Sequence, residues 1–294
     1  MVFALLLGWA RARGAHLVFN MKRAPLLPIS IIVILTLIAI LANVIALHSP
    51  VTTSLPNRLR PPFWMEGGTL TYPLGTDEVG RDILSRVFYG ARISLSVAAL
   101  ALLLGAGIGT TIGLVSGYFG GKTDAILMRA ADTTMAFPII LLALLLAVTR
   151  GPSFQNVVVA IGLVIWTRFA RVIRGEVLSL RESDFVAQAK IAGCSNFRIL
   201  LRHIFPNVIN TLMVLVSLQV GWVIILEATL SFLGAGVPPP TATWGSMIVS
   251  GKEYVTTAWW VLAFPGIAIA LTVIAFNMVG DWLRDTLDPK LRQV

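Results

Sequence analysis

The sequence predicts an all-α integral membrane protein with six transmembrane helices, and three observations support this fold class. Hydrophobic residues make up 56% of the 294 residues and charged residues only 13%, whereas about 25% of a soluble domain is charged. Six apolar segments are long enough to cross a bilayer, and polar stretches separate them. Arg and Lys cluster beside the ends of these segments, as is typical of loops on the cytoplasmic side of a membrane.

Residues 1–25 are expected to form an N-terminal cytoplasmic arm, and residues 26–48 the first transmembrane helix. The arm begins with an apolar stretch too short to span a bilayer, so it is either an interfacial arm or an extension before a start at Met21. The apolar run that follows covers about 22 residues, or about 33 Å of helix. It is longer than the core of about 7–15 residues in a signal peptide. Basic residues before it are expected to keep the N-terminus cytoplasmic.

Residues 49–91 are expected to form an external segment that contains an amphipathic helix. Thr76 is placed to cap this helix, with Asp77 and Glu78 in its first turn and an apolar stripe that includes Ile83. The position of the carboxylates at a helix start explains them without a metal, because a metal site needs more converging oxygen atoms.

Residues 92–282 are expected to form a core of five further transmembrane helices, with a cytoplasmic tail at 283–294. The predicted spans cover residues 93–119, 124–148, 157–174, 207–232 and 260–279. In the first of them, glycine recurs every four residues, which predicts close packing against another helix. These glycines are Gly105, Gly109, Gly113 and Gly117.

Two ionisable residues in these spans are candidates for lining a translocation path. Asp132 lies near the start of its span, where an ion pair with Arg129 is favoured over contact with a substrate. Glu227 lies far inside an apolar segment, which makes it a functional candidate by default. It would equally suit a residue that caps or pairs with a neighbouring helix, so both hypotheses stay open.

Residues 176–206 form the longest polar interruption between two apolar segments and predict a helix, a glycine turn and a second helix. Ser183 is placed to cap the first helix, on which Phe185, Ala189 and Ala192 share one face. Gly193 is placed to end it, because glycine adopts a positive φ without steric cost. Ser195 is placed to cap the second helix and Pro206 suits the first turn of the next span. The apolar face of the second helix consists of Phe197, Leu200, Leu201 and Ile204.

Composition and motifs exclude several other classes of protein. The single cysteine, Cys194, and three scattered histidines offer no disulfide and no metal site, and no cofactor is expected. The net charge of +9 belongs to basic residues beside apolar spans, so the expected partner is membrane lipid and no nucleic acid. Residues 116–123 nearly spell a phosphate-binding loop, but Ser116 stands where the pattern needs glycine. No catalytic pair lies within a span, so the chain is not expected to be an enzyme.

The segment at 176–206 resembles the EAA loop of binding-protein-dependent ABC importers, in which a Glu-Ala-Ala motif, a glycine and an Ile-x-x-Pro motif follow at fixed distances. Gly193 is followed by Ile204-Phe205-Pro206 near the expected distance, whereas Ala187-Gln188-Ala189 lacks the glutamate. The resemblance implies that this loop docks on an ATPase. It implies as coupling residues Phe185, Ala187, Gln188, Ala189, Gly193, Phe197, Leu200, Leu201, Ile204 and Pro206.

From about Tyr72 to Pro289 the chain is similar to the C-type permease subunits of dipeptide and oligopeptide ABC importers. The motifs that carry this similarity include PLGTDEVGRD at 73–82, EATLSFLGAGVPPP at 227–240 and AFNMVGDWLRDTLDP at 275–289. The resemblance implies a type I ABC importer permease fold in a bacterial or archaeal plasma (inner) membrane, with both termini cytoplasmic. It also implies a second permease subunit as heterodimer partner, two cytoplasmic ATP-binding subunits and an external solute-binding protein.

The function that this resemblance implies is the passage of peptides, delivered by the binding protein and driven by ATP hydrolysis in the partner subunits. An importer for nickel or another small solute remains an alternative. A second alternative is a secondary transporter driven by an ion gradient, which would predict inverted repeats and charged residues at the membrane midplane. The sequence shows no obvious internal repeat.

Overall fold

The computed structural model describes residues 24–287, and within them the chain is built of helices and loops with one isolated β-bridge. The predictions for the N-terminal arm, for a start at Met21 and for the last part of the tail concern residues outside this range. The longer elements are α2 (Leu26–Ile45), α3 (Ile83–Phe119), α4 (Gly121–Ala136), α5 (Ile139–Arg150), α6 (Phe154–Arg181), α9 (Phe205–Phe232) and α11 (Trp260–Leu287). The shorter ones are η2 (Leu55–Asn57), α7 (Asp184–Ile191), α8 (Asn196–Ile199), η3 (Leu200–Ile204), α10 (Trp244–Gly251) and η4 (Lys252–Tyr254).

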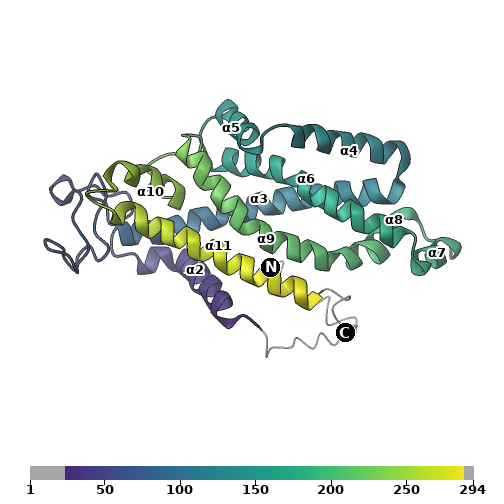
Figure 1. Cartoon of the computed structure of the whole chain (residues 1–294), viewed down its shortest axis with the longest axis horizontal. Helices are drawn as coiled ribbons and strands as arrows, with labels where there is room; N and C mark the ends of the chain where they lie inside the picture. Colours follow the sequence, from purple (N-terminus) through teal and green to yellow (C-terminus); the bar gives the residue numbers. More distant parts are fainter. Residues whose placement is uncertain (1–23, 288–294) are drawn as a thin grey trace.

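The long helices form an elongated bundle with a different small structure at each end (Figure 1). The segment between α2 and α3 lies with α10 at one end, and α7 and α8 lie at the other. Five helices or helix runs of the described residues are long and apolar enough to cross a membrane, and the bent pair α4 and α5 makes a sixth if it counts as one span. The predicted all-α membrane fold is confirmed.

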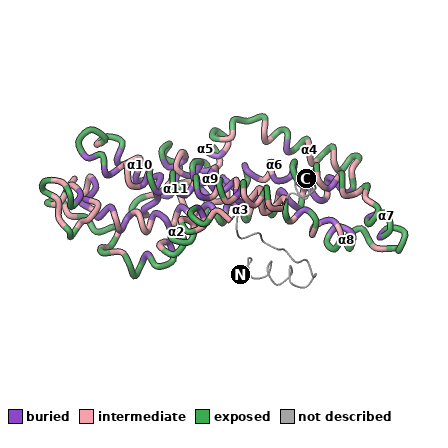
Figure 2. The backbone as a smooth tube through the Cα atoms, turned by 60° about the horizontal axis from the view of Figure 1, so that its bottom comes forward, coloured by how far each residue is buried: buried purple, intermediate pink, exposed green. Residues whose placement is uncertain are grey.

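The predicted single span at 124–148 is wrong in its geometry. It consists of α4 and α5, which meet at an angle of 90°. Pro138 supplies no backbone N–H and disfavours helical backbone angles in the residue before it, and Phe137 accordingly has φ −82° and ψ 141°. α4 runs beside α6 with most of its residues exposed, as Figure 2 shows.

The predicted amphipathic helix capped by Thr76 is also wrong. α3 is a single helix that begins at Ile83, and Asp82 is its cap, because the Asp82 carboxylate accepts the N–H of Ser85 at 3.0 Å. Residues 76–82 form a turn in which the Asp77 carboxylate accepts backbone N–H groups, and these bonds compete with helix formation. α3 therefore joins the later part of the predicted amphipathic helix and the predicted span at 93–119 into one unbroken helix.

The glycine groove predicted on the second span is confirmed and packs against α6. A Cβ atom at Gly109 would lie 2.3 Å from the carbonyl oxygen of Trp166, and one at Gly105 would lie 2.2 Å from the Ile165 side chain. Such distances are shorter than real contacts allow. The two helix backbones approach closely because no side chain separates them.

The buried apolar residues form one main core and a second cluster near α7 and α8. The main core joins α3, α6 and α9, and includes the fully buried Trp244 of α10. The second cluster includes Ile173 and Val177 of α6 together with Val186 of α7 and Ile204 of η3. We call α7 and α8, with the turn between them, the two-helix unit. Side chains as buried as those of the main core anchor this unit to the bundle.

Candidate functional site

The helix, glycine turn and helix predicted at 176–206 are present. α7 ends before Gly193, whose φ of +74° ends the helix, and nothing lies within 4 Å of a Cβ placed there. The N–H of Cys194 donates to the carbonyl of Ala189 across this turn, at 3.0 Å. The Ser195 hydroxyl accepts the N–H of Arg198 and caps α8. The turn thus needs glycine for its backbone angle and not for space.

Ser183 occupies the cap position of α7 without capping it through its side chain. Its hydroxyl donates a hydrogen bond of 2.5 Å to the carbonyl of Leu180, one turn earlier. The hydroxyl therefore stabilises the end of α6, and only the acidic Asp184 complements the start of α7.

The apolar faces of the two short helices differ from the predicted ones. On α7 the buried residues are Val186 and Ala189, while Phe185 and Ala192 are exposed. On the second helix Ile199, Leu200 and Ile204 are buried. By contrast, 72% of Phe197 and 48% of Leu201 is exposed.

A π-helical turn accounts for the exposure of Leu201. Residues Leu200–Ile204 form this turn between α8 and α9. A π turn closes its hydrogen bonds over five residues, so side chains after it rotate relative to the regular period of 3.6. A helical wheel drawn through residues 197–204 therefore assigns Leu201 to the wrong face. Pro206 follows in the first turn of α9, as predicted.

The two-helix unit exposes large apolar side chains among basic ones, and we call this set the coupling surface. Its apolar members are Phe185, Ile191, Phe197 and Leu201. Its basic members are Lys190, Arg198 and Arg202. Ile191 is 88% exposed and was missed by the sequence prediction, although it directly precedes the glycine turn. Exposed apolar side chains gathered in this way are typical of a protein-protein contact.

Polar contacts hold the coupling surface to the bundle. The Tyr118 hydroxyl at the end of α3 donates to the side chain of Asn196 at 2.9 Å. Lys190 lies 5.9 Å from the centre of the Tyr118 ring. Next to this contact, the Arg174 guanidinium binds both carboxylate oxygens of Asp124, each at 2.5 Å. The two contacts of Tyr118 therefore tie α7 and α8 to the end of α3.

Asp132 lies on an exposed face of α4, and the prediction that it pairs with Arg129 is wrong. Its carboxylate pairs with the guanidinium of Arg171 on α6, at 2.5 Å. The side chains of Asp132 and Arg171 are 62% and 47% exposed. The bend at Pro138 lays α4 along α6, so an arginine distant in sequence reaches the carboxylate.

Glu227 is fully buried inside the chain and joins three helices. The Ser231 hydroxyl donates to it at 2.9 Å and the Ser94 hydroxyl of α3 at 3.4 Å. The Ser94 oxygen also accepts the backbone N–H of Trp244 in α10, at 3.2 Å. This geometry agrees with the hypothesis that Glu227 pairs with neighbouring helices. No part of the Glu227 side chain is exposed on the surface of this chain.

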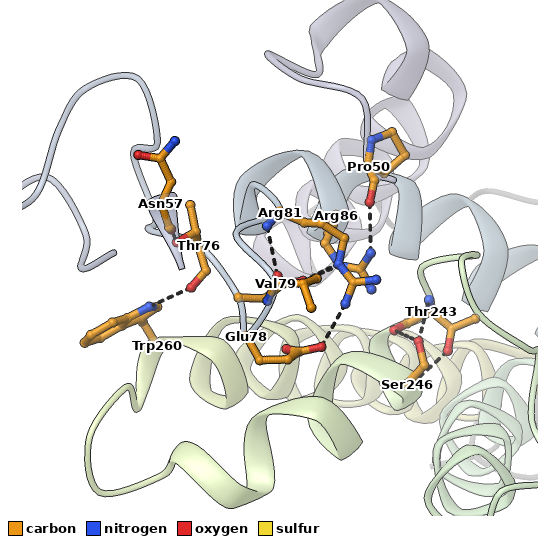
Figure 3. Close-up of polar contacts among 11 residues, drawn as sticks. Pro50, Asn57, Thr76, Glu78, Val79, Arg81, Arg86, Thr243, Ser246 and Trp260 are labelled. Atoms are coloured by element: carbon orange, nitrogen blue, oxygen red, sulfur yellow. Dashed lines mark hydrogen bonds and ion pairs between the residues drawn. The ribbon is translucent and has the colours of Figure 1, made fainter. Parts of the chain in front are cut away.

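Two acidic residues between α2 and α3, Asp77 and Glu78, are engaged by arginines (Figure 3). Asp77 and Glu78 both bind Arg81, at 2.6 and 2.9 Å. The buried Arg86 lies 3.4 Å from the Asp77 carboxylate and donates to the carbonyl of Pro50 at 2.9 Å. These ion pairs fix the segment on the start of α3.

Comparisons with known proteins agree with this geometry. Residues 109–293 match the family described as "Binding-protein-dependent transport system inner membrane component". The chain is 44% identical over 275 residues to the dipeptide transport system permease protein DppC of Escherichia coli (strain K12), a match that covers 94% of this chain and 92% of that protein. It is 42% identical over 262 residues to a putative peptide transport system permease protein of Brucella suis biovar 1 (strain 1330), covering 89% and 86% of the two chains.

A solved structure shares the fold. A chain of the MetNI methionine ABC transporter in an inward-facing conformation superimposes with a TM-score of 0.57 at 15% sequence identity. The match covers 69% of this chain and 97% of that chain. The predicted type I permease fold is thereby confirmed. This chain belongs to the family of binding-protein-dependent transport system inner membrane components, the membrane-spanning permease subunits of ABC importers.

Proposed function

We propose that this chain forms one half of the translocation path of a peptide importer in a bacterial or archaeal plasma membrane. A second permease subunit would complete the path, two ATP-binding subunits would drive it, and an external solute-binding protein would deliver the peptide. The observation that carries the proposal is the coupling surface, because an apolar and basic unit at one end of a membrane bundle needs a partner. The names of the similar permeases support a peptide as cargo.

In the proposed orientation, the end that carries α7 and α8 faces the cytoplasm. Basic residues follow one another along the last part of α6 and the two-helix unit, as expected for the cytoplasmic side. They are Arg174, Arg181, Lys190, Arg198 and Arg202. If α4 and α5 count as one broken span, the six crossings of the proposed orientation would put both termini on this side.

The coupling residues divide into those that would touch the ATPase and those that would hold the touching residues in place. Phe185, Phe197 and Leu201 are exposed and would enter an apolar cleft of the ATPase, while Arg198 and Arg202 would pair with an acidic rim. Ala187 and Gln188 are exposed and would lie at the edge of this contact. The supporting set is Ala189, Gly193, Leu200, Ile204 and Pro206.

The proposed mechanism is alternating access driven from outside this chain. ATP binding would close the two ATPases and move the docked two-helix units with them. η3 continues directly into α9, and Val186 packs with Ile173 and Val177 of α6, so both spans would move with the unit. A relative movement of these spans in the two permeases would open the path to one side of the membrane at a time.

Affinity purification tests this assembly. We would tag the chain, solubilise it in a mild detergent and identify the proteins that co-purify by mass spectrometry. The expected result is a second permease together with two ATP-binding subunits. These subunits are either two copies of one protein or one copy each of two different proteins. Recovery of the chain alone would contradict the proposal and favour a transporter driven by an ion gradient.

Uptake measurements test the cargo. Vesicles that contain the assembly and its binding protein are expected to accumulate a labelled dipeptide only with ATP. A labelled nickel salt serves as the competing cargo. Uptake of nickel with no uptake of dipeptides would retain the importer and refute the peptide proposal.

A further inference from the structure

Arg168 on α6 is held at the side of α9 without an acidic partner. Its Nη1 donates to the side-chain oxygen of Gln219 at 3.3 Å, and its guanidinium carbon lies 4.5 Å from the centre of the Trp222 ring. Among residues 24–287, no carboxylate lies within 4.0 Å of it. A guanidinium has five N–H donors. Within residues 24–287 the Arg168 side chain makes one hydrogen bond, to Gln219, so most of its donors have no protein partner there.

The depth of Arg168 makes this arrangement unusual. α6 begins at Phe154, so the rise per residue places Arg168 about 21 Å along the helix. α9 ends at Phe232, which places Gln219 about 20 Å from that end. Ala160 and Ala235 share one buried cluster, so these two helix ends lie together. The hydrocarbon core of a bilayer is about 30 Å thick, and Arg168 falls within it.

The face around Arg168 does not suit contact with lipid. Arg171 lies on the same face of α6 and pairs with Asp132, and both side chains are largely exposed on this chain. Charged side chains inside a membrane face other protein or a water-filled cavity, because contact with lipid is costly. A broken span such as α4 and α5 is likewise tolerated only where it meets protein or water. This face is thus turned toward the second permease and the path.

We propose that Arg168 binds the C-terminal carboxylate of the peptide as it crosses the membrane, an inference that rests on the peptide importer proposed above. The guanidinium matches a carboxylate through two parallel hydrogen bonds. Gln219 and Trp222 orient it without neutralising its charge. Every unmodified peptide carries this carboxylate whatever its side chains, so a single arginine recognises the whole class of cargo.

The surroundings of Arg168 also explain why the bound peptide would be released. The neighbouring Arg171 is occupied by Asp132, so the carboxylate meets one free guanidinium and not two. Transport requires binding that is strong enough for entry and weak enough for exit. A partly exposed single arginine meets both conditions.

The test compares two cargoes in the complete importer. Proteoliposomes that contain both permeases, the ATPases and saturating binding protein receive either a labelled dipeptide or the same dipeptide with a C-terminal amide. The wild-type assembly is expected to prefer the free acid. Arg168→Gln is expected to lower uptake of the free acid about tenfold and to leave uptake of the amide nearly unchanged, because only the acid loses a charge-assisted contact. Arg168→Lys is expected to retain part of the preference.

A second variant keeps the test valid if Arg168→Gln fails to assemble. Gln219→Glu preserves size and places a carboxylate beside Arg168, so it is expected to occupy the guanidinium and remove the preference for the free acid. Equal preference in wild type and both variants, with peptide uptake intact, would overturn this site alone. No uptake of either dipeptide by the wild-type assembly would overturn both the site and the proposed cargo.

Discussion

Two glycines on α3 give a matched test of how closely this helix packs on α6. A Cβ atom at Gly109 would lie 2.3 Å from the Trp166 carbonyl and 2.6 Å from the Phe169 Cβ, whereas a Cβ at Gly107 would meet nothing within 4 Å. Both lie in the interior of the same helix. Gly109→Ala must therefore push the α6 backbone away, at a cost of about 1–3 kcal/mol. Gly107→Ala should stabilise the helix by about 0.5–1 kcal/mol.

Thermal unfolding of the purified protein in detergent measures this difference. Tryptophan fluorescence suits the assay because Trp166 lies at the contact itself. The two variants should differ by about 1.5–4 kcal/mol in stability, with Gly109→Ala melting below and Gly107→Ala at or above the parent. Equal melting of the two variants would refute the close approach of α3 and α6.

Three further predictions concern the two-helix unit and the buried Glu227. Gly193→Val should strain the turn by about 1–2 kcal/mol, since its φ is +74°, and should abolish uptake while the ATPases still co-purify; normal uptake would refute this role. Leu201→Asp should release the ATPases from a stable chain, whereas Leu200→Asp should unfold the chain, because only Leu200 is buried; co-purification and melting curves separate the two effects. Glu227→Ala should cost about 1–3 kcal/mol by leaving a buried serine hydroxyl unsatisfied, and Glu227→Gln should retain most of the stability; similar melting of both would contradict the hydrogen-bonded role.

The parts of the fold that were predictable have local causes. Apolar run length located the spans, the recurrence of glycine located the face of α3 that meets α6, and Gly193 marked the turn between α7 and α8. Each of these signals depends on neighbours within one or two helical turns. The coupling residues stay predictions, which the substitutions at Gly193 and Leu201 test.

The parts that were not predictable depend on contacts distant in sequence or on unusual backbone geometry. Asp132 lies near Arg129 in sequence, but the bend after Phe137 brings the Asp132 carboxylate to Arg171, with which it forms an ion pair. The π-helical turn exposes Leu201, which no regular helical period reveals. Thr76 was the predicted cap of the helix, but the turn at Asp77 delays the start of α3, and Asp82 caps it instead.

The unbroken length of α3 gives the importer a rigid lever arm. Its 37 residues extend about 55 Å, well beyond the about 30 Å of the hydrocarbon core. At one end, the hydrogen bond from Arg86 to the Pro50 carbonyl fixes α3 to the segment that precedes it. At the other end, the hydrogen bond from Tyr118 to Asn196 joins α3 to the two-helix unit. A tilt of about 5° would displace one end relative to the other by about 5 Å over this length. A movement of α3 at one surface of the membrane can thus displace its other end at the opposite surface with no change within the helix itself.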